Sequence, residues 1–209
     1  MARSPFRVHP AVSYARSILD RLGQTTLHDL DGWLEILRGS PVARADAKTQ
    51  AAWLKSKHGL GGTTARTLAS YASGTEPERF DAEAYLAKAQ ELVEAMFAKK
   101  VALLPIYRAV VDVALSLGDD VGLSPAKTIV PIYREHVFGQ IKPSTKTRLD
   151  LGLALKGAEE PPERIPPTGG LEKGDRITHR IPLHSADEVD GEVGCWLGVA
   201  YELDVSQVS

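Results

Sequence analysis

The chain has 209 residues, of which 43% are hydrophobic and 25% charged, as is ordinary for a globular protein with one large domain or two small ones. The formal net charge of −2 argues against strong binding of a polyanion by the whole surface, and no run approaches the roughly 18 apolar residues of a membrane span. The single cysteine excludes an internal disulfide, and no apolar secretory stretch follows Met1, so we expect a cytoplasmic protein.

The first 75 residues predict a compact, all-helical domain. Apolar residues recur at helical spacing in four segments, 10–22, 26–38, 46–58 and 64–72. Pro10 suits the first turn of a helix, Gly23 ends one, and Thr26 with Asp29 three residues on is the expected cap of the next. This part of the chain holds ten Lys and Arg against five Asp and Glu, a net charge of +5.

The polar segment 73–80 (SGTEPERF) is the predicted boundary between a domain over 1–75 and a second domain over 80–209. Amphipathic spacing then predicts two helices, over 81–100 and 103–118. Short segments that alternate or are rich in β-branched residues predict antiparallel strands over 127–134, 136–143, 147–155 and 176–183.

Three further features complete the second domain. Pro131 predicts an edge strand or a bulge, because proline cannot donate to the sheet. The loop 156–175 is rich in proline and glycine, and 185–203 predicts a closing helix capped by Ser185 with Glu188. The expected fold class is α+β: a small all-helical N-terminal domain, then a C-terminal domain with a mostly antiparallel sheet covered by helices.

The stretch 57–72 (KHGLGGTTARTLASYA) places three glycines directly before a helix. Glycine permits a tight turn, with a positive φ expected at Gly61, and the first amides of the next helix attract anions. The turn is either a plain helical hairpin whose glycines permit close packing or a site for nucleic acid or phosphate. In the second case the binding residues are Lys55, Lys57, Gly59, Gly61, Gly62, Thr63, Thr64 and Arg66.

A second basic set lies on the strands and turns predicted for the C-terminal domain. Residues 127–148 hold five Lys and Arg against Glu135 alone, a net charge of +4. If the strands bring these side chains together, they form a pocket for a phosphate, a carboxylate or a nucleic-acid backbone; the alternative is a solvated sheet face with lysines in its turns. The predicted anion pocket consists of Lys127, Arg134, Lys142, Lys146, Arg148, His179 and Arg180.

Signals of catalysis are poor. Ser124 and Lys127 match Ser-x-x-Lys, but that chemistry needs the serine at a helix start, whereas Lys127 opens a predicted strand. No spacing of His or Cys suggests a zinc site. The sequence therefore favours a protein without catalytic residues, metal or cofactor, although an enzyme stays possible.

Gly59-Leu-Gly-x-x-Thr-Ala, between Leu54 and Leu68, resembles the helix-hairpin-helix motif of DNA repair and recombination proteins, except that Lys57 stands where that family has an apolar residue. This resemblance implies contact with nucleic-acid backbone. The stretch AAWLKSKHGLGGTTA and the helices before it, within residues 10–72, resemble a small bacterial domain of unknown function numbered 4287. Residues 80–203, with SPAKTIVPIYREHVFGQIKPSTKTRLDLGLALKG, resemble domain of unknown function 5655. Neither domain brings a function.

The sequence thus predicts a two-domain binding protein. Its expected partner is DNA or RNA, bound without sequence preference, or another phosphate-bearing anion, held by both basic regions. The alternative is a binder of an anionic small molecule in a pocket between the sheet and the helices of the C-terminal domain. We expect no membrane partner, and the oligomeric state is left open.

Overall fold

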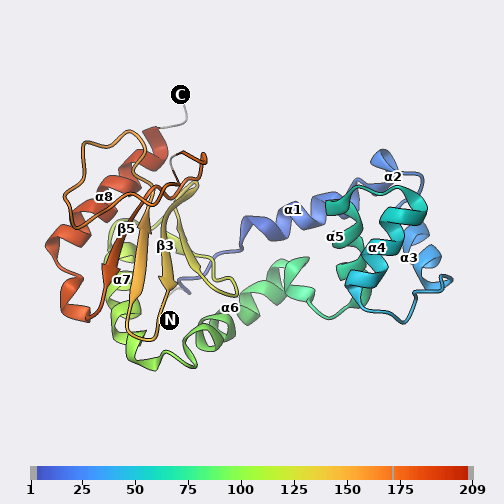
Figure 1. The fold of residues 1–209 in the computed structure, drawn as a ribbon, viewed down its shortest axis with the longest axis horizontal. Coiled ribbons are helices and arrows are strands. Elements are labelled where there is room, and N and C mark those ends of the chain that lie inside the picture. Colours follow the sequence, from blue (N-terminus) through green and yellow to red (C-terminus); the bar gives the residue numbers. More distant parts are fainter. Residues whose placement is uncertain (1–3, 171, 207–209) are drawn as a thin grey trace. The chain divides into compact units, whose positions relative to one another are not determined.

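The structure is a computed structural model that describes residues 4–170 and 172–206 (Figure 1). The chain forms two compact units. Residues 8–88 make up the helical unit, and residues 1–7 together with 89–209 make up the sheet unit. The protein is α+β, with N-terminal helices followed by an antiparallel sheet packed on helices, as the sequence predicts.

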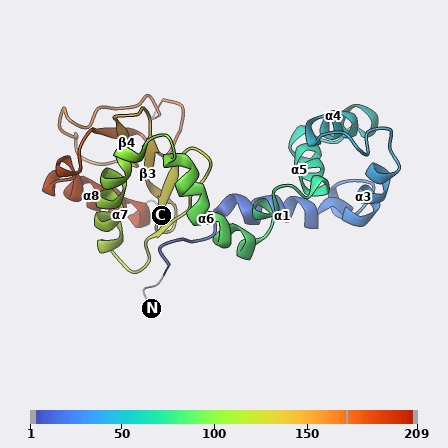
Figure 2. The same ribbon diagram turned by 90° about the horizontal axis from the view of Figure 1, so that it is seen from below.

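The helical unit is built from five α-helices and a 3₁₀ turn. These are α1 (Pro10–Asp20), α2 (Leu22–Thr25), α3 (Leu30–Arg38), α4 (Ala47–His58), α5 (Gly62–Ser73) and η1 (Pro77–Arg79). Leu19, Leu54 and Leu68 are buried at its centre with Trp33, which is 1% exposed. Helices α4 and α5 lie side by side, as Figure 2 shows.

The predicted cap of the second helical segment is wrong. Asp29 caps α3, since its Oδ1 accepts a hydrogen bond from the amide of Gly32 at 2.9 Å. The Thr26 hydroxyl instead accepts from the indole Nε1 of Trp33 at 2.7 Å. Burial of Trp33 requires a partner for its N–H, and Thr26 supplies it.

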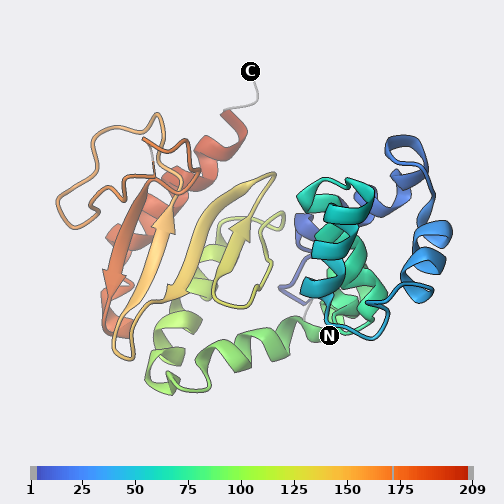
Figure 3. The same ribbon diagram turned by 45° about the vertical axis from the view of Figure 1, so that its right-hand side comes forward.

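In the sheet unit, helices precede and follow the five strands along the chain. In chain order the elements are α6 (Ala82–Phe97), which begins in the helical unit and continues into this one from Ala89, η2 (Val101–Leu103), α7 (Leu104–Ser116), β1 (Gly122–Leu123), β2 (Val130–Tyr133), β3 (Val137–Pro143), β4 (Leu149–Leu153), β5 (His179–Leu183), η3 (Ala186–Glu188) and α8 (Gly191–Ser206). The strands are all antiparallel and lie in the order β1-β2-β3-β4-β5. Helices α7 and α8 lie behind this sheet in Figure 3.

Alternation along β4 separates the two faces of the sheet. Leu149, Leu151 and Leu153 are fully buried in the core of the unit. The β3 residue Gly139 lies under α8, where a Cβ would be 3.3 Å from Leu197. Because successive side chains point to opposite faces, Asp150 and Gly152 lie on the face away from that core.

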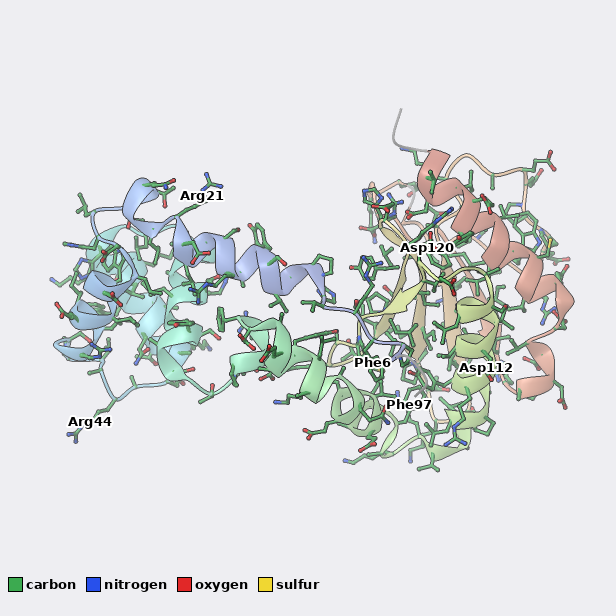
Figure 4. All side chains as sticks on the ribbon, turned by 180° about the vertical axis from the view of Figure 1, so that it is seen from behind. Phe6, Arg21, Arg44, Phe97, Asp112 and Asp120 are labelled. Carbon is green, nitrogen blue, oxygen red and sulfur yellow. The ribbon has the colours of Figure 1, made fainter. Side chains whose placement is uncertain are left out.

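Both edges of the sheet are partly covered. Phe6 (labelled in Figure 4) pairs in parallel with Leu123, whose amide donates to the carbonyl of Pro5 at 2.8 Å. At the other edge the amide of Arg180 donates to the carbonyl of Pro166 at 3.2 Å. These contacts cover part of each edge strand, which reduces the unpaired backbone open to another chain.

Three predicted starts in this unit are wrong, and one of them is the strand expected from residue 176, which begins at His179. The strand expected from residue 127 begins at Val130, and a register shift between Ile132 and Tyr133 follows Pro131. The closing helix begins at Gly191, where Asp190 accepts from the amide of Val193 at 3.0 Å, and not at Ser185. Glu188, the expected partner of that cap, accepts from the amide of His184.

Within the part of the chain that the structure describes, no helix has the length and apolar character needed to span a bilayer.

Candidate functional site

The glycine turn joins α4 to α5 with its leucine inward and its glycines outward. Gly59 has φ 69° and ψ 15°, the left-handed conformation that ends α4, and its amide donates to the carbonyl of Lys55 at 3.1 Å. Leu60 is 7% exposed and packs in the core of the helical unit. Gly61 has φ −57°, so the positive φ expected there belongs to Gly59.

The first turn of α5 has amides without helical partners. Gly61 stands at the N-cap and offers no side chain, so no side-chain hydrogen bond caps the helix. The amides of Gly62, Thr63 and Thr64 come before the first i to i−4 bond, which the amide of Ala65 makes. A Cβ built at Gly59 or Gly61 would meet no atom within 4 Å, so the space outside this turn is open.

Basic side chains stand around these amides. Lys55 and Lys57 lie on the last turn of α4 and Arg66 on the second turn of α5; all three are exposed. Within residues 4–170 and 172–206, none of these three side chains has a hydrogen-bond or ion-pair partner. The predicted residues of the turn are therefore brought together by the hairpin.

A groove runs along the same two helices, with a volume of about 480 Å³. Its small residues, among them Ala51 and Ala65, leave room between α4 and α5. Basic side chains at the groove are Lys48, Lys55, Arg66 and Arg79. The sequence analysis missed Lys48, which lies seven residues and two turns before Lys55 and so on the same helix face.

Asp150 is the centre of the second basic set. It is 7% exposed and lies on β4, directly opposite Lys142 of β3. Its carboxylate accepts from the hydroxyl of Ser144 at 2.6 Å and pairs with Nε of Arg148 at 2.9 Å. Nη1 of Arg180, on β5, lies 3.7 Å from the same carboxylate. Three of the seven predicted pocket residues thus surround a buried acid.

A pocket of about 480 Å³ opens beside Asp150, between the sheet face and the loop that follows β4. Lys142 and Arg180 line it from the sheet, and Lys173 and Arg176 line it from the loop. Neither loop residue is in the predicted pocket: Lys173 lies in an aperiodic loop that gives no spacing from which to place it, and Arg176 was expected to begin a strand that in the structure begins at His179.

The other predicted pocket residues lie elsewhere in the sheet unit. Lys127 is exposed in the loop before β2, and Lys146 is exposed in the turn between β3 and β4. His179 is half-buried, its Nδ1 is 2.9 Å from the hydroxyl of Thr178, and burial lowers its pKa.

Arg134 belongs to a separate cluster. Its guanidinium lies over the ring of Tyr201, 3.9 Å from the centroid, and its Nε donates to Asp120 at 2.8 Å. The hydroxyl of Tyr201 donates to the same carboxylate at 2.9 Å. The hydrogen bond from Arg134 lowers the pKa of Asp120, and burial raises that of Tyr201. The positive charge of Arg134 is therefore already paired with the carboxylate of Asp120 and stacked on the ring of Tyr201.

The residues of the Ser-x-x-Lys match do not form a catalytic pair. Ser124 is fully buried, and its hydroxyl donates to the carbonyl of Arg7 at 3.1 Å. Among the residues that the structure describes, no three His, Cys, Asp or Glu side chains gather as metal ligands would.

The fold and these sites define a two-unit α+β protein, with a glycine hairpin in the first unit and a basic sheet face in the second. Residues 14–74 match the family described as domain of unknown function DUF4287, and residues 93–204 match that described as domain of unknown function DUF5655. The second match covers more than half of the chain, which therefore belongs to the DUF5655 family. Both predicted resemblances are confirmed, the second from residue 93. Comparison with curated proteins and with solved structures gives no significant match.

Proposed function

We propose that the helical unit binds the phosphate backbone of nucleic acid, without sequence preference, through the α4–α5 hairpin. The observation that carries the proposal is the open space beside Gly61. A glycine that serves close packing has atoms where a Cβ would stand, and a glycine that serves a turn has a positive φ. At Gly61 no atom stands where a Cβ would lie, and its φ is negative. Packing and turn geometry within the unit therefore do not explain why this residue is glycine. A bare backbone that a phosphate can approach does explain it.

The charge around the turn supports the same function. A phosphate held by the amides of Thr63 and Thr64 would lie within reach of the long side chains of Lys55, Lys57 and Arg66. These cations have no acidic partner among the described residues, so binding would not require an ion pair to break. Amides and lysines contact phosphates and not base edges, so the expected affinity is indifferent to sequence.

The experiment is fluorescence anisotropy of labelled duplexes of two unrelated sequences, with the full chain titrated at several salt concentrations. Neutralising two to four phosphates gives a log–log slope of roughly −2 to −4. Arg66→Ala should reduce the magnitude of that slope by about one unit on both duplexes.

Two variants complete the test. Gly61→Val should leave the fold intact, because a Cβ at this position meets no atom within 4 Å, but should weaken binding by blocking the phosphate. Arg44→Ala is the charge-matched control: Arg44 is exposed in the loop before α4, as Figure 4 shows, at the end of the helix opposite the turn. No binding at about 50 mM salt, or equal slope changes for Arg44→Ala and Arg66→Ala, would overturn the proposal.

A further inference from the structure

One pocket lies on the face of the sheet that points away from α7 and α8. One of its walls is formed by strands and the other by a loop. Strands β3, β4 and β5 form one wall, and the other is formed by residues of the loop before β5, namely Thr168, Gly170, Lys173, Asp175, Arg176 and Ile177. Both contribute cations, and Val137 and Ile177 add apolar surface. Its volume of about 480 Å³ lies within the range of small-molecule sites.

The loop wall is held in place by contacts to the rest of the unit. Thr168 donates its amide to the carbonyl of Thr178 at 2.9 Å. Arg176 donates from Nε to the carbonyl of Val137 at 2.8 Å and pairs with the buried carboxylate of Asp204. Asp204 also accepts from the amide of His136 at 2.8 Å. A wall fixed in this way costs little ordering when a ligand binds.

Charge in the pocket is unbalanced in favour of the cations. Four bases line it against two acids, Asp150 and Asp175, and one of the bases, Arg176, is already paired with Asp204. Asp150 is already paired with Arg148 and hydrogen-bonded by Ser144, so it adds little free negative charge.

The two lysines that line the pocket come from different walls. Lys142 stands on β3 and Lys173 on the loop, and both are exposed. In the described parts of the chain, 4–170 and 172–206, the side chain of neither lysine has a hydrogen-bond or ion-pair partner. Arg180, whose one carboxylate neighbour lies 3.7 Å away, completes the set.

We propose that this pocket binds a small molecule that carries a phosphate monoester. Such a group has close to two negative charges at pH 7 and three acceptor oxygens, which match the ammonium groups of Lys142 and Lys173 and the guanidinium of Arg180. The apolar part of the ligand would rest on Val137 and Ile177. The site uses residues of the sheet unit alone and does not depend on nucleic-acid binding by the hairpin.

The test uses the full chain with inorganic phosphate and glycerol 3-phosphate as probes. Both should raise the Tm above that in chloride of equal ionic strength, because a ligand that binds the folded state stabilises it. Glycerol 3-phosphate should also bind in isothermal titration calorimetry. Succinate provides a dianion without phosphate geometry, and stabilisation by succinate equal to that by phosphate would overturn the assignment to a phosphate monoester.

Matched lysine variants locate the site. Lys142→Ala and Lys173→Ala should each weaken glycerol 3-phosphate binding about tenfold, as expected for the loss of one charge-assisted hydrogen bond. Lys146→Ala removes the same charge from the same unit but outside the pocket, and Arg66→Ala removes one from the hairpin; both should bind as the wild type does. The proposal fails if phosphate and chloride act alike, or if Lys146→Ala weakens binding as much as Lys142→Ala.

Discussion

Gly152 on β4 and Ile177 in the loop above it are in direct contact: a Cβ at Gly152 would lie 2.6 Å from Cγ2 of Ile177. Cβ atoms essentially never approach a neighbour within 3.0 Å. Ile177 is β-branched, so Cγ2 cannot move aside without a change of χ1 or of the backbone. The absence of a side chain at Gly152 thus sets how closely the loop wall of the pocket approaches the sheet.

Gly152→Ala should therefore displace the loop and open the pocket. We expect a loss of about 1–3 kcal/mol in the free energy of unfolding, the usual cost of overpacking, and weaker glycerol 3-phosphate binding. Urea unfolding followed by circular dichroism and titration calorimetry measure the two effects. Gly191→Ala is the control, because a Cβ there meets no atom and alanine is favoured in a helix. Unchanged stability and unchanged binding in Gly152→Ala would contradict the prediction.

The second prediction concerns where the helical unit ends. The sequence boundary at 73–80 assigns residues 1–75 to the first domain, whereas the structure includes Phe80 in the core of the helical unit. Phe80 is 8% exposed and meets the ring of Tyr71 edge-on at 5.2 Å. Close by, Glu78 pairs with Lys88 at 2.8 Å.

A fragment 8–88 should consequently be more stable than a fragment 1–75. The difference should be about 3–5 kcal/mol, as for removal of a buried phenylalanine. Thermal unfolding by circular dichroism compares the two, and Phe80→Ala in fragment 8–88 should reproduce much of the loss. Equal Tm values for fragments 1–75 and 8–88 would show that Phe80 adds nothing to this core. Independent folding of 1–75 and 80–209 stays a prediction.

The spacing of apolar residues along the chain predicted most helices and strands. The features that it did not predict depend on contacts between residues distant in the sequence. The alternating leucines of β4 predict a strand, and that is found, with all five of its residues buried. Strand β1 has two residues, too few for any periodicity, and is defined by its pairing with β2 and with Phe6, which lies more than 110 residues earlier. Ser185 and Asp190 are both acceptable helix caps, so local preference does not choose between them.

The candidate sites show the same limit. The glycine hairpin is local, and its turn and flanking helices were predicted from one short stretch. The basic sheet face needed the register of β3, β4 and β5 to bring Lys142 and Arg180 to one pocket. Arg134 counts as a free base in the sequence, but it stacks on Tyr201 of a helix that lies far along the chain. A count of charges along the sequence cannot distinguish a cation that lines a pocket from one that is already paired within the fold.

The third prediction concerns the dependence of stability on pH. His9 caps α1, where its Nδ1 accepts a hydrogen bond from the amide of Ala11 at 3.0 Å. Only a neutral imidazole can accept this bond, and burial lowers the pKa of His9 below its ordinary value of 6.5. The unfolded chain therefore takes up the proton more readily than the folded one. Stability from His9 is complete above pH 6.5 and is lost as the pH falls through 6.5 towards the folded-state pKa.

His9→Ser should remove this part of the pH dependence. A serine hydroxyl caps a helix at any pH, so near pH 8 the variant should unfold at a temperature close to that of the wild type. Between pH 6.5 and 5 the Tm of the wild type should fall more steeply than that of His9→Ser. His179, whose pKa burial also lowers, contributes equally to both proteins and cancels in the comparison. Thermal unfolding of the two full-length chains across this range is the measurement, and parallel curves would mean that the neutral form of His9 does not stabilise α1.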